Sequence, residues 1–190
     1  MLKKTNLKKY FSIYRPFLQF LTIFFGVYLF TTFLYQSYLN SYAIENHEVD
    51  GFTTFVAHQS NYIVVLFDKN AHVMASKTEA SVLLFYKNKN VAKVVEGCNA
   101  ISIAILFISF IVAFAGKFKP TLFFSLFGIF IIHIINILRI GLLSVLFFEI
   151  PEYKSVLHGV VFPFIIYSIV FILWIIWTNK FSKYATKSSK

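Results

Sequence analysis

Long apolar stretches dominate the chain and are joined by shorter polar connections. They lie at residues 16–39, 99–115, 121–148 and 157–177. A helix needs about 20 apolar residues, with a range of roughly 17–25, to cross the hydrocarbon core of a bilayer. We therefore predict four transmembrane helices, of which the second is short and the third is long enough to tilt. The first stretch holds 24 residues. This exceeds the roughly 7–15-residue apolar core of a signal peptide, so we expect it to remain as a helix.

The segment between the first two stretches, residues 40–97, carries two other patterns. Helical spacing relates Phe52, Phe55, Val56, Gln59 and Ile63. This spacing predicts an amphipathic helix that lies on the protein or on the membrane surface. Further along, two β-branched apolar runs at 81–86 and 91–95 flank a polar turn at 87–90, which predicts a β-hairpin. The expected fold is thus an all-α polytopic membrane protein, one domain over residues 1–190, with a small external helix and hairpin.

The composition supports a membrane protein. Hydrophobic residues make up 58% of the chain, charged residues only 14%, and the mean hydropathy is +0.70. A soluble domain usually carries about 25% charged residues. The composition therefore argues against a disordered chain and a water-soluble enzyme. The net charge of +10 would suggest nucleic acid as a partner in a soluble chain, but the placement of the charges points elsewhere, and we expect no nucleic acid.

The charges predict the orientation of the chain. Eleven Lys and Arg and no acid lie in residues 1–15, in the turn 116–120 and after Thr178. All eight acids and six Lys lie in segments 40–97 and 149–156. Cytoplasmic segments of membrane proteins are enriched in Lys and Arg. We therefore expect both termini in the cytoplasm, the acidic segments outside, and the cell inner membrane as the location.

Three reactive side chains are predicted at the same outer level of the membrane. Arg139, the only charged residue of the third stretch, lies 18 residues or about 27 Å of helix after Thr121. An arginine at the centre of a membrane helix costs about 2.5–3.5 kcal/mol, so it is rarely there by chance. Cys98 and His158 begin the second and fourth stretches at their outer ends. The topology therefore predicts a thiol, a guanidinium and an imidazole close to one interface.

These three groups suit nucleophilic catalysis. A histidine can take the proton of a thiol and later return it to a leaving amine. The start of a helix at Cys98 would favour the thiolate, and Arg139 could stabilise an oxyanion. Asn136 lies one turn before Arg139 on the same helix face, and we find no carboxylate in the bundle to orient the histidine. A single cysteine excludes an internal disulfide and a CxxC metal site. We expect no cofactor and no metal.

Each of these residues also has a structural interpretation. A lone cysteine is commonly a small buried hydrophobic residue, an arginine at the membrane rim reaches toward lipid headgroups, and a histidine there can cap a helix. The common level of the three favours a site over these alternatives. Structural roles are expected for His133 in packing or a hydrogen bond, for His47, His58 and His72 at the surface, and for Trp174 and Trp177 as interfacial anchors.

Three short motifs resemble the exosortase/archaeosortase family, and most of all the short exosortase F type of Bacteroidetes. They are Val94-Val95-Glu96-Gly97-Cys98-Asn99, Asn136-Ile137-Leu138-Arg139 and Leu157-His158-Gly159. The resemblance covers roughly residues 80–175. The family's cysteine is usually followed by Ser-Gly, whereas this chain has Asn99-Ala100. Asn99 can still donate a hydrogen bond.

The resemblance implies a membrane-embedded cysteine transpeptidase or protease. Its partners would be the lipid bilayer and secreted proteins that end in a short motif, a hydrophobic helix and a basic tail. Cys98 would form a thioester, Arg139 would support the oxyanion and His158 would carry the proton, with Asn136 and Asn99 in supporting positions. An amine acceptor or water would resolve the thioester. The alternatives are a non-catalytic subunit that binds a partner's transmembrane helix, and a transporter, which lacks support because no buried acid or inverted repeat is found.

Overall fold

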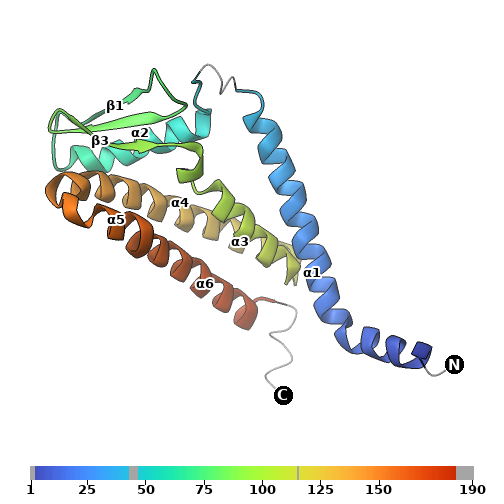
Figure 1. The fold of residues 1–190 in the computed structure, drawn as a ribbon. Helices are drawn as coiled ribbons and strands as arrows, with labels where there is room; N and C mark the ends of the chain where they lie inside the picture. Colours follow the sequence, from blue (N-terminus) through green and yellow to red (C-terminus); the bar gives the residue numbers. More distant parts are fainter. Residues whose placement is uncertain (1–2, 43–46, 115, 183–190) are drawn as a thin grey trace.

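The structure is a computed structural model that describes residues 3–42, 47–114 and 116–182. Its elements are α1 (Lys3–Leu39), α2 (Gly51–Val65), β1 (His72–Ala75), β2 (Val82–Tyr86), β3 (Lys89–Val94), α3 (Ile101–Ala113), α4 (Phe118–Glu149), α5 (Lys154–Val156) and α6 (Phe162–Lys180) (Figure 1). Shorter 3₁₀ turns at Glu96–Cys98 and Pro151–Tyr153 and a π-helical turn at Leu157–Val161 complete them. The turn Pro151–Tyr153, α5, the π-helical turn and α6 follow one another without a break and form one nearly continuous helix from Pro151 to Lys180.

Among the described residues, three helices are long and apolar enough to cross a membrane. They are Ile13–Leu39 within α1, Phe118–Glu149 and Pro151–Lys180. These helices indicate a multi-pass membrane protein and confirm the first, third and fourth predicted spans. The second predicted span, 99–115, is not among these three helices. Its helix, α3, has only 13 residues and a rise of about 20 Å, compared with the roughly 30 Å of a hydrocarbon core.

The short helix α3 forms the centre of the bundle, where it contacts α1, α4 and α6. Phe107 is fully buried, and a methyl group at Gly128 of α4 would overlap its ring, so the two helices approach closely. Trp177 of α6 is also fully buried, in the same apolar core between the helices as Phe107. Trp174 stacks on Phe110 of α3 with a distance of 4.3 Å between the ring centroids. The prediction of interfacial anchors is thus wrong for Trp177, because its ring fills the helix bundle.

The external part contains a three-stranded antiparallel sheet in the order β1-β2-β3 within the described residues. The predicted hairpin is confirmed as β2-β3, and β1 adds a third strand that the sequence did not predict to a structure that is otherwise helical. The turn is shorter than predicted: it consists of Lys87 and Asn88, both with positive φ, as in a type I′ turn. Lys87 donates a 2.7 Å hydrogen bond to Glu149 at the end of α4, which raises the pKa of the Lys87 ammonium and fastens the hairpin tip to the bundle.

The predicted external helix is confirmed as α2, which packs between the sheet and α4. Its buried face differs from the predicted one, since Phe55 is 51% exposed and the buried residues are Thr53, Val56, Ala57, Ser60 and Val64. Small side chains line this face because α2 lies close to α4: a methyl group at Gly141 would approach Ile63 to 2.6 Å. The helix thus lies inside the protein and is covered on two sides.

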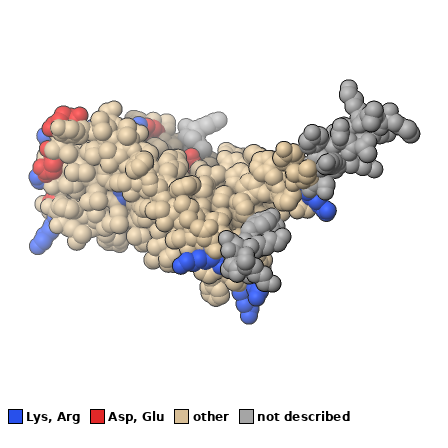
Figure 2. Space-filling model, turned by 90° about the horizontal axis from the view of Figure 1, so that it is seen from below, with Lys and Arg blue, Asp and Glu red and all other residues tan. Residues whose placement is uncertain are grey.

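The elements stack in layers from the sheet through α2 and α4 to α6, and α1 stands to one side against α3 (Figure 1). The α3–α4 turn, the end of α6 and the start of α1 lie away from the sheet (Figure 1). On the face seen in Figure 2, acidic side chains gather at the end of the molecule that carries the hairpin and α5. Glu45, which belongs to the predicted external acidic set, lies outside the described residues.

Candidate active site

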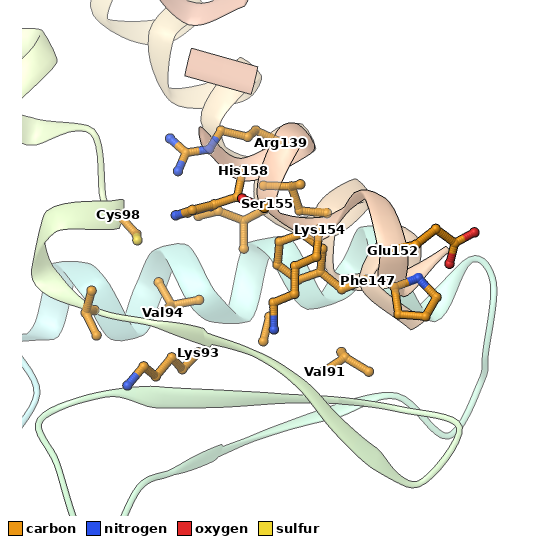
Figure 3. Close-up of a pocket in the computed structure, with 15 residues that line it drawn as sticks. Val91, Lys93, Val94, Cys98, Arg139, Phe147, Glu152, Lys154, Ser155 and His158 are labelled. Carbon is orange, nitrogen blue, oxygen red and sulfur yellow. The ribbon is translucent and has the colours of Figure 1, made fainter. Parts of the chain in front are cut away.

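A cavity of about 650 Å³ lies between β3, the second half of α4 and the helical segment that begins at Pro151. The three side chains singled out from the sequence, Cys98, Arg139 and His158, all line it. In the close-up, the thiol, the guanidinium and the imidazole are directed into one space from three different elements (Figure 3). The tertiary fold thus brings together three residues that are up to 60 positions apart in the sequence.

Cys98 is held by its backbone. It ends the 3₁₀ turn Glu96–Cys98, where its N–H donates to the Val95 carbonyl at 2.8 Å. Its own carbonyl accepts a 2.8 Å hydrogen bond from Nδ2 of Asn136, a fully buried residue of α4. Asn136 therefore positions the cysteine relative to the helix that carries Arg139, in line with the supporting role expected from the sequence.

The expectation that Cys98 begins the second helix is wrong. Two residues separate it from α3, and the second of them, Ala100, has φ 65°, in the left-handed region. The first N–H of α3, at Ile101, is already bound by Oδ1 of Asn99 at 2.9 Å. The first free N–H at the start of α3 is thus satisfied by the Asn99 side chain and not by the thiol.

Asn99 faces away from the cavity and holds the loop from the other side. Its Nδ2 donates to the Tyr35 hydroxyl at 2.8 Å and to Thr53 Oγ1 at 3.0 Å. The Tyr35 hydroxyl in turn donates to Glu96 at 2.7 Å. Asn99 thereby joins α1, α2 and α3 directly behind Cys98, which makes it a positioning residue. Because Glu96 is engaged with α1, its carboxylate is not available to orient His158.

Arg139 and His158 face Cys98 across the cavity. Arg139 is half-buried, its Nε is buried without a hydrogen bond, and none of the salt bridges within the described residues includes it. Its guanidinium is therefore available to a ligand. His158 lies within the π-helical turn Leu157–Val161, seven residues into the helical segment rather than at its start. Such π turns occur frequently at functional sites, because the extra residue shifts the direction of a side chain.

Sequence reasoning missed the polar residues that complete the cavity wall, namely Lys93, Glu152, Lys154 and Ser155. Ser155 precedes His158 by one turn, whereas the carboxylate of Glu152 is directed away from the imidazole (Figure 3). It also missed Tyr35 and Thr53 behind the cysteine loop. A tyrosine or threonine among many others carries no signal of its own, so only the tertiary contacts could have found these two.

The remaining histidines have structural positions, as predicted. His133 forms a 2.8 Å hydrogen bond between its Nε2 and Oε1 of Gln59, and its ring stacks against Phe55 at 6.0 Å. His47, His58 and His72 are exposed. These four side chains lie outside the lining of the cavity that contains Cys98.

Comparison with known proteins gave no family assignment. No family model matches the chain, and neither a curated protein nor a solved structure matches it.

The backbone at Ala100 leads to a stability prediction. A left-handed conformation costs a residue with a Cβ about 1–2 kcal/mol, whereas glycine adopts it readily. We therefore expect Ala100→Gly to stabilise the folded protein by about 1 kcal/mol. The matched control is Ala104→Gly, four residues further in the right-handed part of α3, which should lose about 0.5–1 kcal/mol. Reversible unfolding in mixed micelles by SDS measures both, and a loss of stability in both variants would contradict the strain.

Proposed function

We propose that this protein is a membrane-embedded cysteine transpeptidase or protease. It cleaves the C-terminal sorting signal of secreted proteins at the outer face of the cell inner membrane. The observation that carries the proposal is the convergence of Cys98, Arg139 and His158 on one cavity, from three separate elements. The charge asymmetry of the sequence supports the orientation, in which both termini are cytoplasmic and the cavity opens outside.

The chemistry follows from the three groups. His158 accepts the thiol proton, and the sulfur of Cys98 attacks the carbonyl carbon of the scissile peptide. Arg139 stabilises the negative charge that develops on the carbonyl oxygen. The peptide C–N bond then breaks, His158 gives its proton to the leaving amine, and a thioester on Cys98 remains. An amine or water attacks the thioester and transfers a proton to His158, which restores the thiol.

The proposed substrates are secreted proteins that end in a short motif, one hydrophobic helix and a basic tail. The lipid bilayer holds both proteins at matching depths, so that the motif lies at the level of Cys98. The basic tail of the substrate then remains on the cytoplasmic side, the same side as the basic termini of the enzyme.

A second candidate function is a non-catalytic subunit that binds a partner's transmembrane helix. It is favoured by α1, whose apolar window has no fully buried residue and which contacts α3 on one side only, so that its other sides are open to a partner or to lipid. The two functions differ in their need for the thiol. A binding subunit keeps its activity without Cys98, whereas the enzyme loses it.

The thioester provides the direct test of the enzyme. Membranes from host cells are solubilised at low pH, the protein is digested with trypsin, and the peptide that contains Cys98, the only cysteine of the chain, is analysed by mass spectrometry. We expect a fraction of this peptide to carry a peptide adduct, and neutral hydroxylamine should remove the adduct because it cleaves thioesters. A Cys98 peptide that is unmodified during active secretion would contradict the proposal and favour the binding subunit.

A further inference from the structure

The edge of the sheet forms one wall of the cavity. Five consecutive residues, 91–95, line it. Side chains alternate between the two faces of a strand, so a cavity that lay on one face would be lined by every second residue. A run of consecutive lining residues indicates that the edge of the strand, with its backbone groups, borders the space. β3 is the outer strand of the sheet, since it pairs only with β2 within the described residues.

This edge leads directly to the candidate nucleophile. The strand ends at Val94, and the 3₁₀ turn that follows brings Cys98 back to within a 2.8 Å backbone hydrogen bond of Val95. In the close-up, the strand passes along the cavity and the thiol lies at its end (Figure 3). A chain that follows the edge of β3 would therefore arrive at Cys98.

The opposite wall is suited to the side chains of such a chain. It includes an apolar part formed by Ile140, Leu143 and Phe147 of α4. Lys154 lies beside them, with its ammonium 4.9 Å from the centre of the Phe147 ring. Five residues of strand span about 16 Å, and the volume of the cavity lies within the roughly 300–1,000 Å³ of ligand pockets. The cavity thus has the edge of β3 on one side and an apolar part of α4 on the other.

We propose that the segment of the substrate directly before its hydrophobic helix binds as an extended strand along β3 and becomes the fourth strand of the sheet. This inference rests on the proposed function and specifies how the same site takes its substrate. Backbone hydrogen bonds with the edge provide affinity, and alternate side chains against the apolar wall provide selectivity. The peptide bond at the end of the added strand is the one presented to Cys98.

The direction of the added strand follows from the topology. β3 runs toward Cys98, after which the chain enters the bundle through α3. The substrate also runs through its motif toward a helix in the membrane. The added strand is therefore parallel to β3, and residues further upstream in the substrate lie beside residues further from Cys98.

Site-specific photocrosslinking tests the pairing and its direction. Val91 or Val95, both half-buried in the cavity wall, is replaced by p-benzoylphenylalanine in the Cys98→Ala protein, which is then irradiated in host membranes. We expect adducts from both positions within one segment just before the C-terminal hydrophobic helix of a secreted protein. Those from position 91 should lie about four residues upstream of those from position 95. The matched control is Met74 on β1, the opposite edge of the sheet and 48% exposed, which should give no adduct with this segment.

Backbone N-methylation then tests whether the pairing uses main-chain hydrogen bonds. Synthetic ten-residue peptides of the crosslinked segment, each with a single N-methyl amide, compete for the adduct at position 95 in detergent. A strand pairs through every second amide along one edge. We expect methylation to weaken competition by about tenfold at alternate positions and to have little effect at those between. Absent adducts, a reversed order, or a methylation effect without alternation would overturn the added strand.

Different results would contradict the added-strand proposal and the catalytic proposal. If adducts and alternation are found but no thioester forms on Cys98, the edge of β3 is a peptide-binding site and the catalytic proposal is wrong. If the thioester forms but the adducts are scattered or absent, the catalytic proposal stands and the strand is overturned.

Discussion

Replacing Cys98 with serine should abolish removal of the C-terminal tail from a secreted substrate. The hydroxyl has the size of the thiol and can donate the same hydrogen bond, but it is a far weaker nucleophile at neutral pH. Loss of the nucleophile in comparable enzymes removes the rate enhancement almost entirely, so we expect a decrease of more than about 10³-fold. A gel-shift assay in the host, with a tagged protein that ends in a motif, a hydrophobic helix and a basic tail, measures the retained tail.

A matched serine variant controls for the fold. Ser109 is buried in α3, and its hydroxyl donates to the Ile105 carbonyl of its own helix at 2.7 Å. Ser109→Ala should process the substrate at the normal rate. Continued processing in an inserted Cys98→Ser protein would show that the thiol is not the nucleophile. The three cavity residues would then be a structural cluster, and the binding-subunit alternative would replace the enzyme.

Arg139→Ala is expected to have the second largest effect, a decrease of about 10²–10³-fold in the rate of processing. The guanidinium has no acidic partner among the described residues and its Nε is unbonded, so its removal breaks no ion pair of the folded protein. The amount of inserted protein should therefore remain normal while the chemical step slows. Pulse-chase labelling of the tagged substrate gives the rate, and immunoblotting of membranes gives the amount.

The second arginine of the chain provides the control. Arg15 lies on α1, in the basic N-terminal segment and outside the lining of the cavity. Arg15→Ala should leave the processing rate unchanged, and Arg139→Lys should restore only part of it, because lysine is a point charge without the planar fork of donors. Equal losses in Arg15→Ala and Arg139→Ala would mean that both act through insertion or orientation, and the oxyanion role would be wrong.

The predictions of helices and strands were correct where the local sequence pattern matches the surroundings of the segment in the folded protein. The first, third and fourth spans follow from long apolar runs, and the β2-β3 hairpin follows from β-branched runs around a polar turn. Errors arose where neighbours decided the outcome. The apolar stretch 99–115 predicts a second span, but the chain enters α3 only at Ile101, whose N–H binds Oδ1 of Asn99, and the helix has 13 residues. Likewise, the position of Trp177 at the end of an apolar stretch predicts an interfacial anchor, but the neighbouring helices bury its side chain completely.

The site divides in the same manner. Cys98, Arg139 and His158 were found from sequence because reactive side chains within apolar runs or at their ends are unusual, and the topology predicts a common level for them. Asn136 was found through its spacing from Arg139. The contacts of Asn99 and Glu96 could not be predicted from sequence. Each side chain binds Tyr35 of α1, and no local pattern indicates such a contact. The edge of β3 borders the cavity because of the way in which the sheet packs on α2 and α4, which the sequence does not indicate.

The sequence by itself determined the apolar helices and predicted a common level for the three reactive groups, because hydrophobic length and charge act residue by residue along the chain. Only the tertiary structure decided which side chains face the cavity. A helix or strand can present any of its sides to a neighbour, and the choice depends on close approaches such as those at Gly128 and Gly141. These contacts join residues far apart in the sequence. The direction of Cys98 and the position of the strand beside it are therefore properties of the packed molecule.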